Sequence, residues 1–461
     1  MADVIAELER TLGAGAVLAG DEVPAANRHD WSGLPATTPL ALVRPRSTAE
    51  VAATLRICHA AGVPVVPQGG LTGLCGGARA AAGEVALSLE RLVGIDEIDP
   101  ATATITLAAG TPLERAQEVA AEAGFLLALD LGARGSCTIG GNVATNAGGN
   151  RVIRYGMTRE LVLGLEVVLA DGTVLSSLNK LVKNNAGYDL RQLFIGSEGT
   201  LGVVTRVVLR LHPLPASIAA GFCGLPDFPA VLALLQAARR QLGASLSAFE
   251  GMWHEFYECM VTRASGVRAP LAQRHPFYVL LEAHGSDPVD GERFEAFLGR
   301  MLEQGVVRDA AVAQSTAQLR AFWAVRDAVA EYATIVGPMV NFDVGLVTGR
   351  MHDVVEVLRR EIETRWPGAV AHFYGHIGDG NLHVNVHVPG AAGQPKAAIE
   401  ALVYRVVRDH GGSISAEHGI GVTKLAYLGY SRTPAELALM RTLKQALDPR
   451  NILNPGKVVG G

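Results

Sequence analysis

Residues 371–388 alternate polar and apolar side chains on both sides of a glycine-rich turn, Gly-Asp-Gly-Asn at 378–381. This pattern predicts a β-hairpin, and with that turn as its loop His376 falls opposite His383. Because side chains alternate along a strand, one face of the hairpin should be polar and the other apolar. The polar face would carry His372, Tyr374, His376, His383, Asn385 and His387, and the apolar face Phe373, Ile377, Leu382, Val384 and Val386.

Two opposed histidines on this face predict a metal site. Directly paired residues in an antiparallel ladder hold their Cβ atoms roughly 4.5 to 5.5 Å apart, which lets two imidazoles share one ion. Glu417, in the later segment SAEHGIG, would complete a set of two histidines and one carboxylate with an open position for substrate. The alternative is that these histidines are surface or core residues satisfied by hydrogen bonds. Four histidines and an asparagine on one face favour the metal.

Length and composition describe a multidomain globular protein. A chain of 461 residues exceeds one ordinary core, so two or three domains are expected. Hydrophobic residues make up 49% and glycine occurs 53 times, which is typical of a folded protein with many tight turns and not of a disordered one. The net charge of -5, without a long basic run, argues against a nucleic-acid partner.

The sequence favours a cytoplasmic location. No stretch approaches the ~20 apolar residues that cross a bilayer. The segment MADVIAELER carries acidic residues where a signal peptide has a basic start. The five cysteines are odd in number and lack CxxC spacing, as expected of reduced thiols in a reducing compartment.

The first half of the chain has the strand, helix, strand order of an α/β unit. Within residues 41–67, Ser47 and Glu50 form a capping-box pattern at a helix start. The apolar residues 63–67 follow as a short buried strand. Such units build a sheet with a helix packed on it.

A second helix is predicted after a strand at 102–110. It would open at Thr111, with Pro112 at its first position and Glu114 completing another capping box. Near 214–216 the glycine-rich character ends and helical, charged segments begin, which marks a domain boundary. The predicted divisions are 1–216, 217–420 and 421–461.

Three glycine-rich segments predict a long dinucleotide cofactor. They span Pro67–Gly77, Gly132–Gly149 and Gly196–Thr205. Such loops let backbone N–H groups approach an anion closely. Further donors are the side chains of Ser136, Thr138, Asn142 and Thr145. Neither of the first two matches the phosphate loop that ends in Gly-Lys-Ser/Thr, or GxGxxG opening a helix. The alternative is that they are tight turns between packed strands.

Seven motifs resemble the FAD-binding, vanillyl-alcohol-oxidase-like superfamily, and within it the D-2-hydroxyglutarate and D-lactate dehydrogenase branch. They are PQGGLTGLCGG, GSCTIGGNVATNAGGNRVIRYG, LGLEVVLADGTVL, KNNAGYDLRQLFIGSEGTLGVVT, GHIGDGNLHVNV, SAEHGIG and LDPRNILNPGKV. The resemblance runs in order from about residue 40 to the C-terminus. It implies an α+β fold: a two-subdomain FAD-binding region, a substrate or cap domain with an antiparallel sheet and the metal site, and a C-terminal helical segment returning to the flavin.

The resemblance also implies site residues. The metal ligands would be His376, His383 and Glu417, the catalytic base His418, and the substrate-binding residues Arg326, Asn385 and His418. The FAD-binding residues would be Pro67, Gln68, Gly69, Gly70, Leu71, Thr72, Gly73, Ser136, Thr138, Gly140, Gly141, Asn142, Ala144, Thr145, Gly149, Glu198, Gly202, Val203 and Asn454. No histidine occurs in Pro67–Gly77, where some relatives attach FAD covalently, so FAD is expected to bind non-covalently. The metal would be zinc, with manganese, iron or cobalt as alternatives.

The implied activity is oxidation of a D-2-hydroxy acid such as 2-hydroxyglutarate, malate or lactate. The fork of Arg326 suits a substrate carboxylate, although an arginine exposed on a helix is the plain alternative. In the hydroxyglutarate enzymes a threonine and a lysine also hold the distal carboxylate, and the matching positions here are Ala330 and Asn341. This difference weakens the expectation of a dicarboxylate.

Two other functions stay open at this point. One is an oxidase of the same fold that passes electrons to oxygen. The other is a flavin-binding protein in which the metal is structural and no turnover occurs; His418 would then be a structural residue. A dehydrogenase would need an electron acceptor, such as an electron-transfer flavoprotein, a quinone or a cytochrome, and a homodimer is expected.

Overall fold

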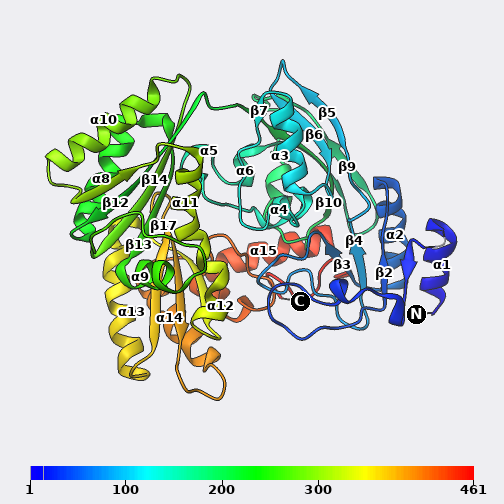
Figure 1. Ribbon diagram of the computed structural model, residues 1–461. Helices are drawn as coiled ribbons and strands as arrows, with labels where there is room; N and C mark the ends of the chain where they lie inside the picture. The colour runs from blue at the N-terminus through cyan, green and yellow to red at the C-terminus, as the bar shows by residue number, and fades with distance from the viewer. Residues whose placement is uncertain (1, 14, 461) are drawn as a thin grey trace. The chain divides into compact units, whose positions relative to one another are not determined.

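The computed structural model describes residues 2–13 and 15–460. It consists of two compact units (Figure 1). Unit 1 comprises Met1–Gly149, Gly156–Leu214 and Glu417–Gly461, and unit 2 comprises Asn150–Tyr155 and Pro215–Ala416. The chain therefore enters unit 2 twice, first as a short segment and then as a long one.

The first sheet of unit 1 contains the predicted strand, helix, strand unit. Its order is β1 (Val17–Leu18), β2 (Ala41–Val43), β4 (Val85–Ser88) and β3 (Val65–Gln68), and the last three are parallel. The crossover helix α2 (Thr48–Ala61) begins where Ser47 accepts a hydrogen bond from the Glu50 N–H at 3.2 Å. It ends at Gly62, whose φ of 67° is the left-handed conformation that favours glycine.

The second sheet of unit 1 is antiparallel and curls so that its two edges approach. Its order is β5 (Ile95–Asp99), β6 (Thr104–Ala108), β10 (Val203–Arg210), β8 (Val162–Val168) and β9 (Val174–Ser177). Lys180, just after one edge strand, donates to Glu97 and Asp99 of the other at 2.8 and 2.9 Å. Buried aliphatic side chains from both sheets share one core.

The predicted capping box at Thr111 is wrong. Helix α3 (Leu113–Glu122) begins two residues later, with Pro112 as a cap that makes no side-chain hydrogen bond. The Thr111 hydroxyl is used elsewhere, because it bonds both the N–H and the carbonyl of Gly94 at 3.1 Å. The Thr111 hydroxyl is therefore bonded to the loop at Gly94 and does not cap the helix.

The remaining α-helices and β-strands of unit 1 are short, apart from the two terminal helices. They are α1 (Ala2–Leu12), β7 (Phe125–Leu126), α4 (Ile139–Thr145), α6 (Thr158–Leu161), α7 (Arg191–Phe194), β11 (His212–Pro213) and α15 (Pro434–Leu447). After α15 the chain lies beside β3, where the Val65 N–H donates to Ile452 and the Asn454 N–H donates to Val65. The C-terminal residues therefore belong to the core of unit 1.

Unit 2 is built on one seven-stranded antiparallel sheet. Its order is β15 (Asp309–Val312), β12 (Ser217–Leu225), β14 (Phe277–Gly285), β13 (Leu246–Trp253), β17 (Val370–His376), β18 (Asn381–His387) and β16 (Val340–Gly345). Its helices are α5 (Val152–Tyr155), α8 (Phe228–Gln241), α9 (His254–Arg263), α10 (Asp290–Glu303), α11 (Thr316–Asp327), α12 (Tyr332–Ile335), α13 (Met351–Arg365) and α14 (Lys396–Asp409).

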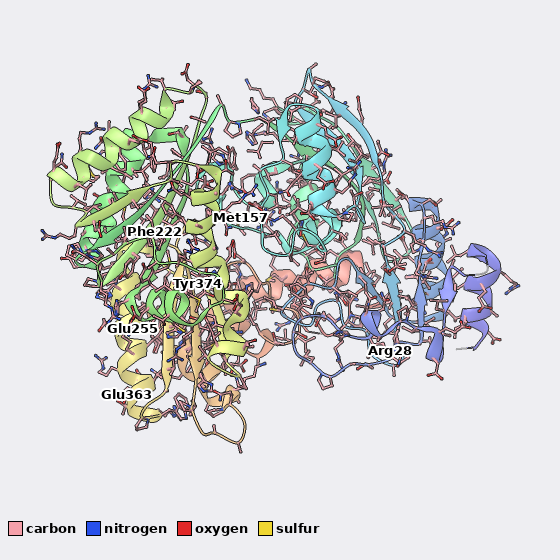
Figure 2. All side chains as sticks on the ribbon, in the orientation of Figure 1. Arg28, Met157, Phe222, Glu255, Glu363 and Tyr374 are labelled. Carbon is pink, nitrogen blue, oxygen red and sulfur yellow. The ribbon has the colours of Figure 1, made fainter. Side chains whose placement is uncertain are left out.

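Helices cover this sheet according to the alternation of its side chains. On the apolar face, Phe342 packs on Tyr404 of α14 and Phe373 lies under the Arg359 guanidinium of α13. On the other face, Tyr374, which is labelled in Figure 2, stacks on Phe256 of α9 with ring centroids 4.1 Å apart. The predicted division of the hairpin into two faces is confirmed.

The predicted register of the hairpin is wrong by two residues. His383 lies opposite Tyr374, which makes His376 its diagonal neighbour. The turn comes one residue earlier than predicted, because the His376 carbonyl accepts from the N–H groups of both Asp379 and Gly380. Ile377 therefore lies in the turn. A shift of two keeps every side chain of the two strands on its predicted face, so the polar face is unchanged.

Among the described residues, no helix has both the length and the apolar composition that crossing a membrane requires. All five cysteines lie in the interior.

Candidate active site

Two rows of facing side chains run across the polar face of the unit 2 sheet. The first row is His372, Asn385 and Asn341, and the second is Tyr374, His383 and Asp343. All are buried except the exposed Asn341. Strands β17, β18 and β16 supply one residue each to every row, so the rigid sheet sets their spacing.

His376 is held by a buried carboxylate. It lies directly opposite Glu250 of β13, and its Nδ1 is 2.5 Å from Glu250 Oε1. The other oxygen, Oε2, accepts from Arg326 Nε at 3.2 Å, and Arg326 Nη2 lies 3.2 Å from His376 Nε2. Burial raises the pKa of Glu250, but the neighbouring His376 and Arg326 outweigh it and hold the pKa below its usual range. An ionised carboxylate only accepts, so Nδ1 carries the proton and Nε2 the lone pair.

The two predicted metal-binding histidines lie close together. The ring centroids of His376 and His383 are 5.4 Å apart. Glu417 is joined by one peptide bond to Ala416, the last residue of unit 2, whose N–H donates to Asp343. His376, His383 and Glu417 each offer one ligand atom within 4.8 Å of the others. These three residue types fit a divalent transition metal such as zinc.

Two asparagines beside the histidines have buried polar atoms to spare. Asn385 is 4% exposed; its Nδ2 donates to Asn341 Oδ1 at 2.7 Å, while its own Oδ1 has no hydrogen-bond partner. Asn381 is also 4% exposed, and neither its Oδ1 nor its Nδ2 has a partner. Buried polar groups are normally bonded, so these atoms are free to bind a polar ligand. Asn381 was not predicted.

His372 shares the face but differs from the other two histidines. Its Nδ1 lies 2.8 Å from the Tyr332 hydroxyl, and burial lowers the pKa of His372 to about 4. It is therefore neutral at physiological pH and already hydrogen-bonded within unit 2.

The first two glycine-rich loops of unit 1 touch each other through their backbones. A Cβ on Gly70 would lie 1.9 Å from the Ser136 carbonyl oxygen, and one on Gly69 would lie 2.6 Å from Thr138 Oγ1. Leu71 has a φ of 58°, so the chain turns sharply there. The Thr138 hydroxyl is buried and has no partner. The backbone at Gly69 and Gly70 carries no side chain and lies beside the unbonded Thr138 hydroxyl. This arrangement fits the predicted binding of FAD.

Several predicted FAD-binding side chains already bond within unit 1. Gln68 Nε2 donates to two backbone carbonyls at 3.0 Å each. Asn454 Nδ2 donates to the carbonyls of Gly77 and Glu198 at 3.0 and 2.7 Å. These contacts hold the loops in place, and the roles of Gln68 and Asn454 in FAD binding stay predictions.

Glu198 anchors the loop that carries His418. Its two carboxylate oxygens accept from the N–H groups of Ile420 and Gly421 at 2.7 and 2.9 Å. Gly419 lies so close that a Cβ there would be 2.7 Å from Glu198 Oε1. The backbone that follows His418 is therefore fixed within unit 1.

Three predicted glycines are required by packing. A Cβ would lie 2.6 Å from Ala109 Cβ at Gly140, 2.5 Å from Val167 Cγ1 at Gly202, and 2.0 Å from the Asp130 carbonyl oxygen at Gly149. The other predicted FAD-binding residues, Pro67, Thr72, Gly73, Gly141, Asn142, Ala144, Thr145 and Val203, also lie in unit 1 and stay predictions.

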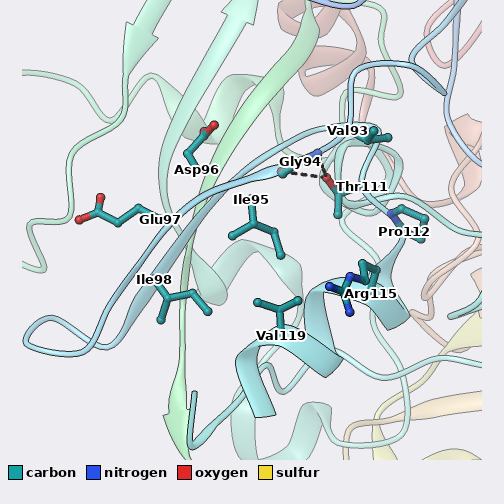
Figure 3. Close-up of a pocket in the computed structure, with 10 residues that line it drawn as sticks. All are labelled: Val93, Gly94, Ile95, Asp96, Glu97, Ile98, Thr111, Pro112, Arg115 and Val119. Carbon is teal, nitrogen blue, oxygen red and sulfur yellow. Dashed lines mark hydrogen bonds between the residues drawn. The ribbon is translucent and has the colours of Figure 1, made fainter. Parts of the chain in front are cut away.

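A groove of about 730 Å³ lies between β5 and α3 (Figure 3). It contains none of the predicted site residues. The Thr111 hydroxyl on its wall is occupied by Gly94, as the dashed line in Figure 3 shows. We assign it no function.

Two buried glutamates were missed in the sequence. Glu250 is 1% exposed in β13, and Glu282 is 0% exposed in the neighbouring β14. Glu282 accepts from Arg151 Nε at 3.1 Å and from Trp323 Nε1 at 2.9 Å, and it lies 2.8 Å from His284 Nε2. A single acid inside an apolar strand, as in LSAFEGMW and FYVLLEAHG, is the signal that would have found both, because buried charges are paired.

Comparison with known proteins assigns the family. Residues 39–177 match the FAD binding domain model, and residues 214–458 match the C-terminal domain of FAD linked oxidases. The chain belongs to the FAD-linked oxidase family. It is thus an FAD-dependent oxidoreductase, as predicted.

Relatives extend over nearly the whole chain. The mitochondrial D-2-hydroxyglutarate dehydrogenase of Bos taurus is 43% identical over 99% of this chain and 83% of its own length. The D-2-hydroxyglutarate dehydrogenase of Xanthomonas citri pv. viticola is 42% identical over 93% of this chain and 91% of its own. A putative mitochondrial D-lactate dehydrogenase of Schizosaccharomyces pombe is 40% identical over 92% and 82%.

Solved structures confirm the fold. The p-cresol methylhydroxylase structure matches with a TM-score of 0.78 at 16% identity, covering 100% of this chain and 96% of that one. An alkyldihydroxyacetonephosphate synthase matches with a TM-score of 0.76, also at 16% identity, over 99% and 86%. The predicted vanillyl-alcohol-oxidase type of fold is therefore confirmed.

Proposed function

We propose that this protein is an FAD-dependent, metal-assisted dehydrogenase that oxidises a D-2-hydroxy acid to the 2-oxo acid. The observation that carries the proposal is the buried pair His376 and His383 beside the Arg326 guanidinium. Such a face offers ligand atoms for a cation and a fork for a carboxylate. The relatives named D-2-hydroxyglutarate dehydrogenase support the choice of substrate class.

FAD would be held non-covalently by the glycine-rich loops of unit 1. Backbone N–H groups around Gly69 and Gly70, with the Thr138 hydroxyl, would bind its pyrophosphate. When bound, FAD supplies the acceptor for the hydride of the substrate C2 atom. Glu198 and Asn454 keep the surrounding loops in position.

A divalent ion, zinc in our proposal, would be held by His376, His383 and Glu417. Such an ion lowers the pKa of a bound hydroxyl and orients its carrier. His376 is prepared for this role, because the hydrogen bond to Glu250 leaves Nε2 with its lone pair.

The side chains would divide the remaining work. His418 would take the substrate hydroxyl proton as general base. Asn385 would hold a substrate oxygen through its amide, and Arg326 would bind a carboxylate in a bidentate way. Arg326 on helix α11 and Asn385 on strand β18, both in unit 2, would thus set the orientation of the substrate.

The leading substrates are D-2-hydroxyglutarate and D-malate, and the alternative is D-lactate or glycolate. The neutral Asn341 beside Asn385 favours the alternative, because the hydroxyglutarate enzymes are expected to carry a lysine at this position. The relative named a putative D-lactate dehydrogenase also supports it.

Electrons would pass from reduced FAD to an electron-transfer flavoprotein, a quinone or a cytochrome. The cytoplasmic location stays a prediction, and several relatives carry "mitochondrial" in their names. The homodimer stays a prediction.

Turnover of a panel of D- and L-2-hydroxy acids with an artificial electron acceptor tests the proposal. We expect activity with D-2-hydroxyglutarate, D-malate or D-lactate and little hydrogen peroxide in the absence of the acceptor. Stoichiometric peroxide would identify an oxidase instead.

A further inference from the structure

Glu250 contacts two residues of the candidate site, His376 and Arg326. It is fully enclosed in the middle of the unit 2 sheet, opposite His376 across the β13–β17 pairing. One oxygen faces His376 Nδ1 at 2.5 Å, and the other accepts from Arg326 Nε at 3.2 Å. One carboxylate therefore contacts both a proposed metal ligand and the proposed substrate cation.

We propose that Glu250 is a positioning residue that sets the tautomer of His376 and the orientation of the Arg326 guanidinium. The inference rests on the proposed function, because it assumes that His376 binds the metal and that Arg326 binds the substrate carboxylate. In this view Glu250 touches neither metal nor substrate.

The geometry of the carboxylate explains both effects. A histidine whose Nδ1–H is bonded to a carboxylate presents Nε2 as a lone pair and becomes a stronger ligand. The same carboxylate accepts from Arg326 Nε, which fixes the plane of the guanidinium beside His376, whose Nε2 lies 3.2 Å from Arg326 Nη2. The sheet and helix α11 bring these groups together from distant parts of the chain.

A purely structural role is the competing explanation, and the chain contains a matched control. Glu282 lies on the adjacent strand β14, is equally buried, and likewise contacts one arginine and one histidine, Arg151 and His284. It contacts neither proposed metal ligand. Glutamine at either position should lower stability in the same way, because each leaves buried partners without their charge.

Zinc titration of the FAD-loaded protein by calorimetry separates the two roles. A glutamine at 250 accepts through one atom and donates through the other, so it cannot serve the donors of His376 and Arg326 together. We expect Glu250→Gln to weaken zinc binding by roughly 10- to 100-fold. Glu282→Gln should bind zinc as the unmodified protein does. Equal zinc affinity in both variants would overturn the inference.

A second measurement keeps the inference testable if Glu250→Gln does not fold. Nitrogen-15 NMR of the unmodified protein without added metal should show His376 protonated at Nδ1, with His376→Ala used to assign the signals. A proton on Nε2 would overturn the inference. If the unmodified protein takes up no zinc, the proposed metal site is wrong, and the His376 tautomer alone then decides the role of Glu250.

Discussion

The side-chain amide of Asn385 donates to Asn341 Oδ1 at 2.7 Å across strands β18 and β16. Residue 341 is thus a neutral group bonded to a proposed substrate-binding residue. Arg326 and Asn385 would face the substrate without a second cation at this position. The charge of residue 341 is therefore the clearest candidate for what selects between mono- and dicarboxylates.

Replacing Asn341 by lysine should shift the substrate preference. Because Asn341 is exposed, a lysine can be accommodated and would add a cation for the distal carboxylate. A charged hydrogen bond is worth roughly 1.5 to 3 kcal/mol, so kcat/KM for D-2-hydroxyglutarate relative to D-lactate should rise about tenfold or more. Steady-state kinetics with both substrates measures this ratio. An unchanged ratio would mean that residue 341 does not face the substrate.

Arg326→Ala tests the carboxylate fork. We expect KM to rise by roughly ten- to a hundredfold for D-malate or D-2-hydroxyglutarate, and much less for D-lactate. Comparing the two substrate classes in one variant cancels any general loss from leaving Glu250 without its arginine. Equal losses would show that Arg326 binds the C1 carboxylate common to all the substrates, or only supports the fold.

The fold and the polar face were accessible from the sequence because alternation is a local property. In strands such as β17 and β18, the alternation of polar and apolar residues shows which side chains share a face. An error of two residues in the pairing register does not change this assignment. The turn geometry places His376 diagonal to His383 and depends on hydrogen bonds from the N–H groups of Asp379 and Gly380. The alternation of side chains in the sequence does not predict these hydrogen bonds.

The partners of the buried acids could not be derived in the same way. Glu250 meets Arg326 and His376 from positions 76 and 126 residues away in the chain. A lone acid in an apolar strand signals that a partner exists, but the sheet order decides which one. The predicted capping box at Thr111 is wrong for the opposite reason. The local pattern is present, but the Thr111 hydroxyl instead bonds Gly94 in a tertiary contact.

His383→Ala should remove the metal and nearly all turnover while FAD is retained, because the FAD loops belong to unit 1. Losing one of three ligands destroys a site of this type. Metal content by elemental analysis and the flavin absorbance of the same sample measure the two properties. His387→Ala is the control, since His387 lies on the same strand outside the proposed ligand set. Full metal loading of His383→Ala would refute the assignment.

Glu282→Gln should make the stability of unit 2 less dependent on pH. Burial raises the pKa of Glu282, but the His284 hydrogen bond and the Arg151 charge outweigh it, and the pKa falls to about 2 from an ordinary 4.5. A depressed pKa stabilises the fold above the unfolded value and loses that contribution as the pH falls toward 2.

The unmodified protein should therefore exceed Glu282→Gln by roughly 3 to 5 kcal/mol in free energy of unfolding at pH 7. The gap should stay constant down to about pH 5 and narrow below it. Urea denaturation of both proteins at pH 7, 5, 4 and 3 gives the comparison. A gap that does not depend on pH would mean that Glu282 is already protonated in the folded protein.

Anaerobic mixing of the FAD-loaded protein with single 2-hydroxy acids tests the central claim most directly, because it needs no electron acceptor. The account predicts that D-2-hydroxyglutarate, D-malate or D-lactate bleaches the flavin absorbance band within a turnover, while the L-enantiomers leave it unchanged. It also predicts that a zinc chelator abolishes the bleaching without releasing FAD. A flavin that no D-2-hydroxy acid reduces would contradict the account and leave a flavin-binding protein with a structural histidine cluster.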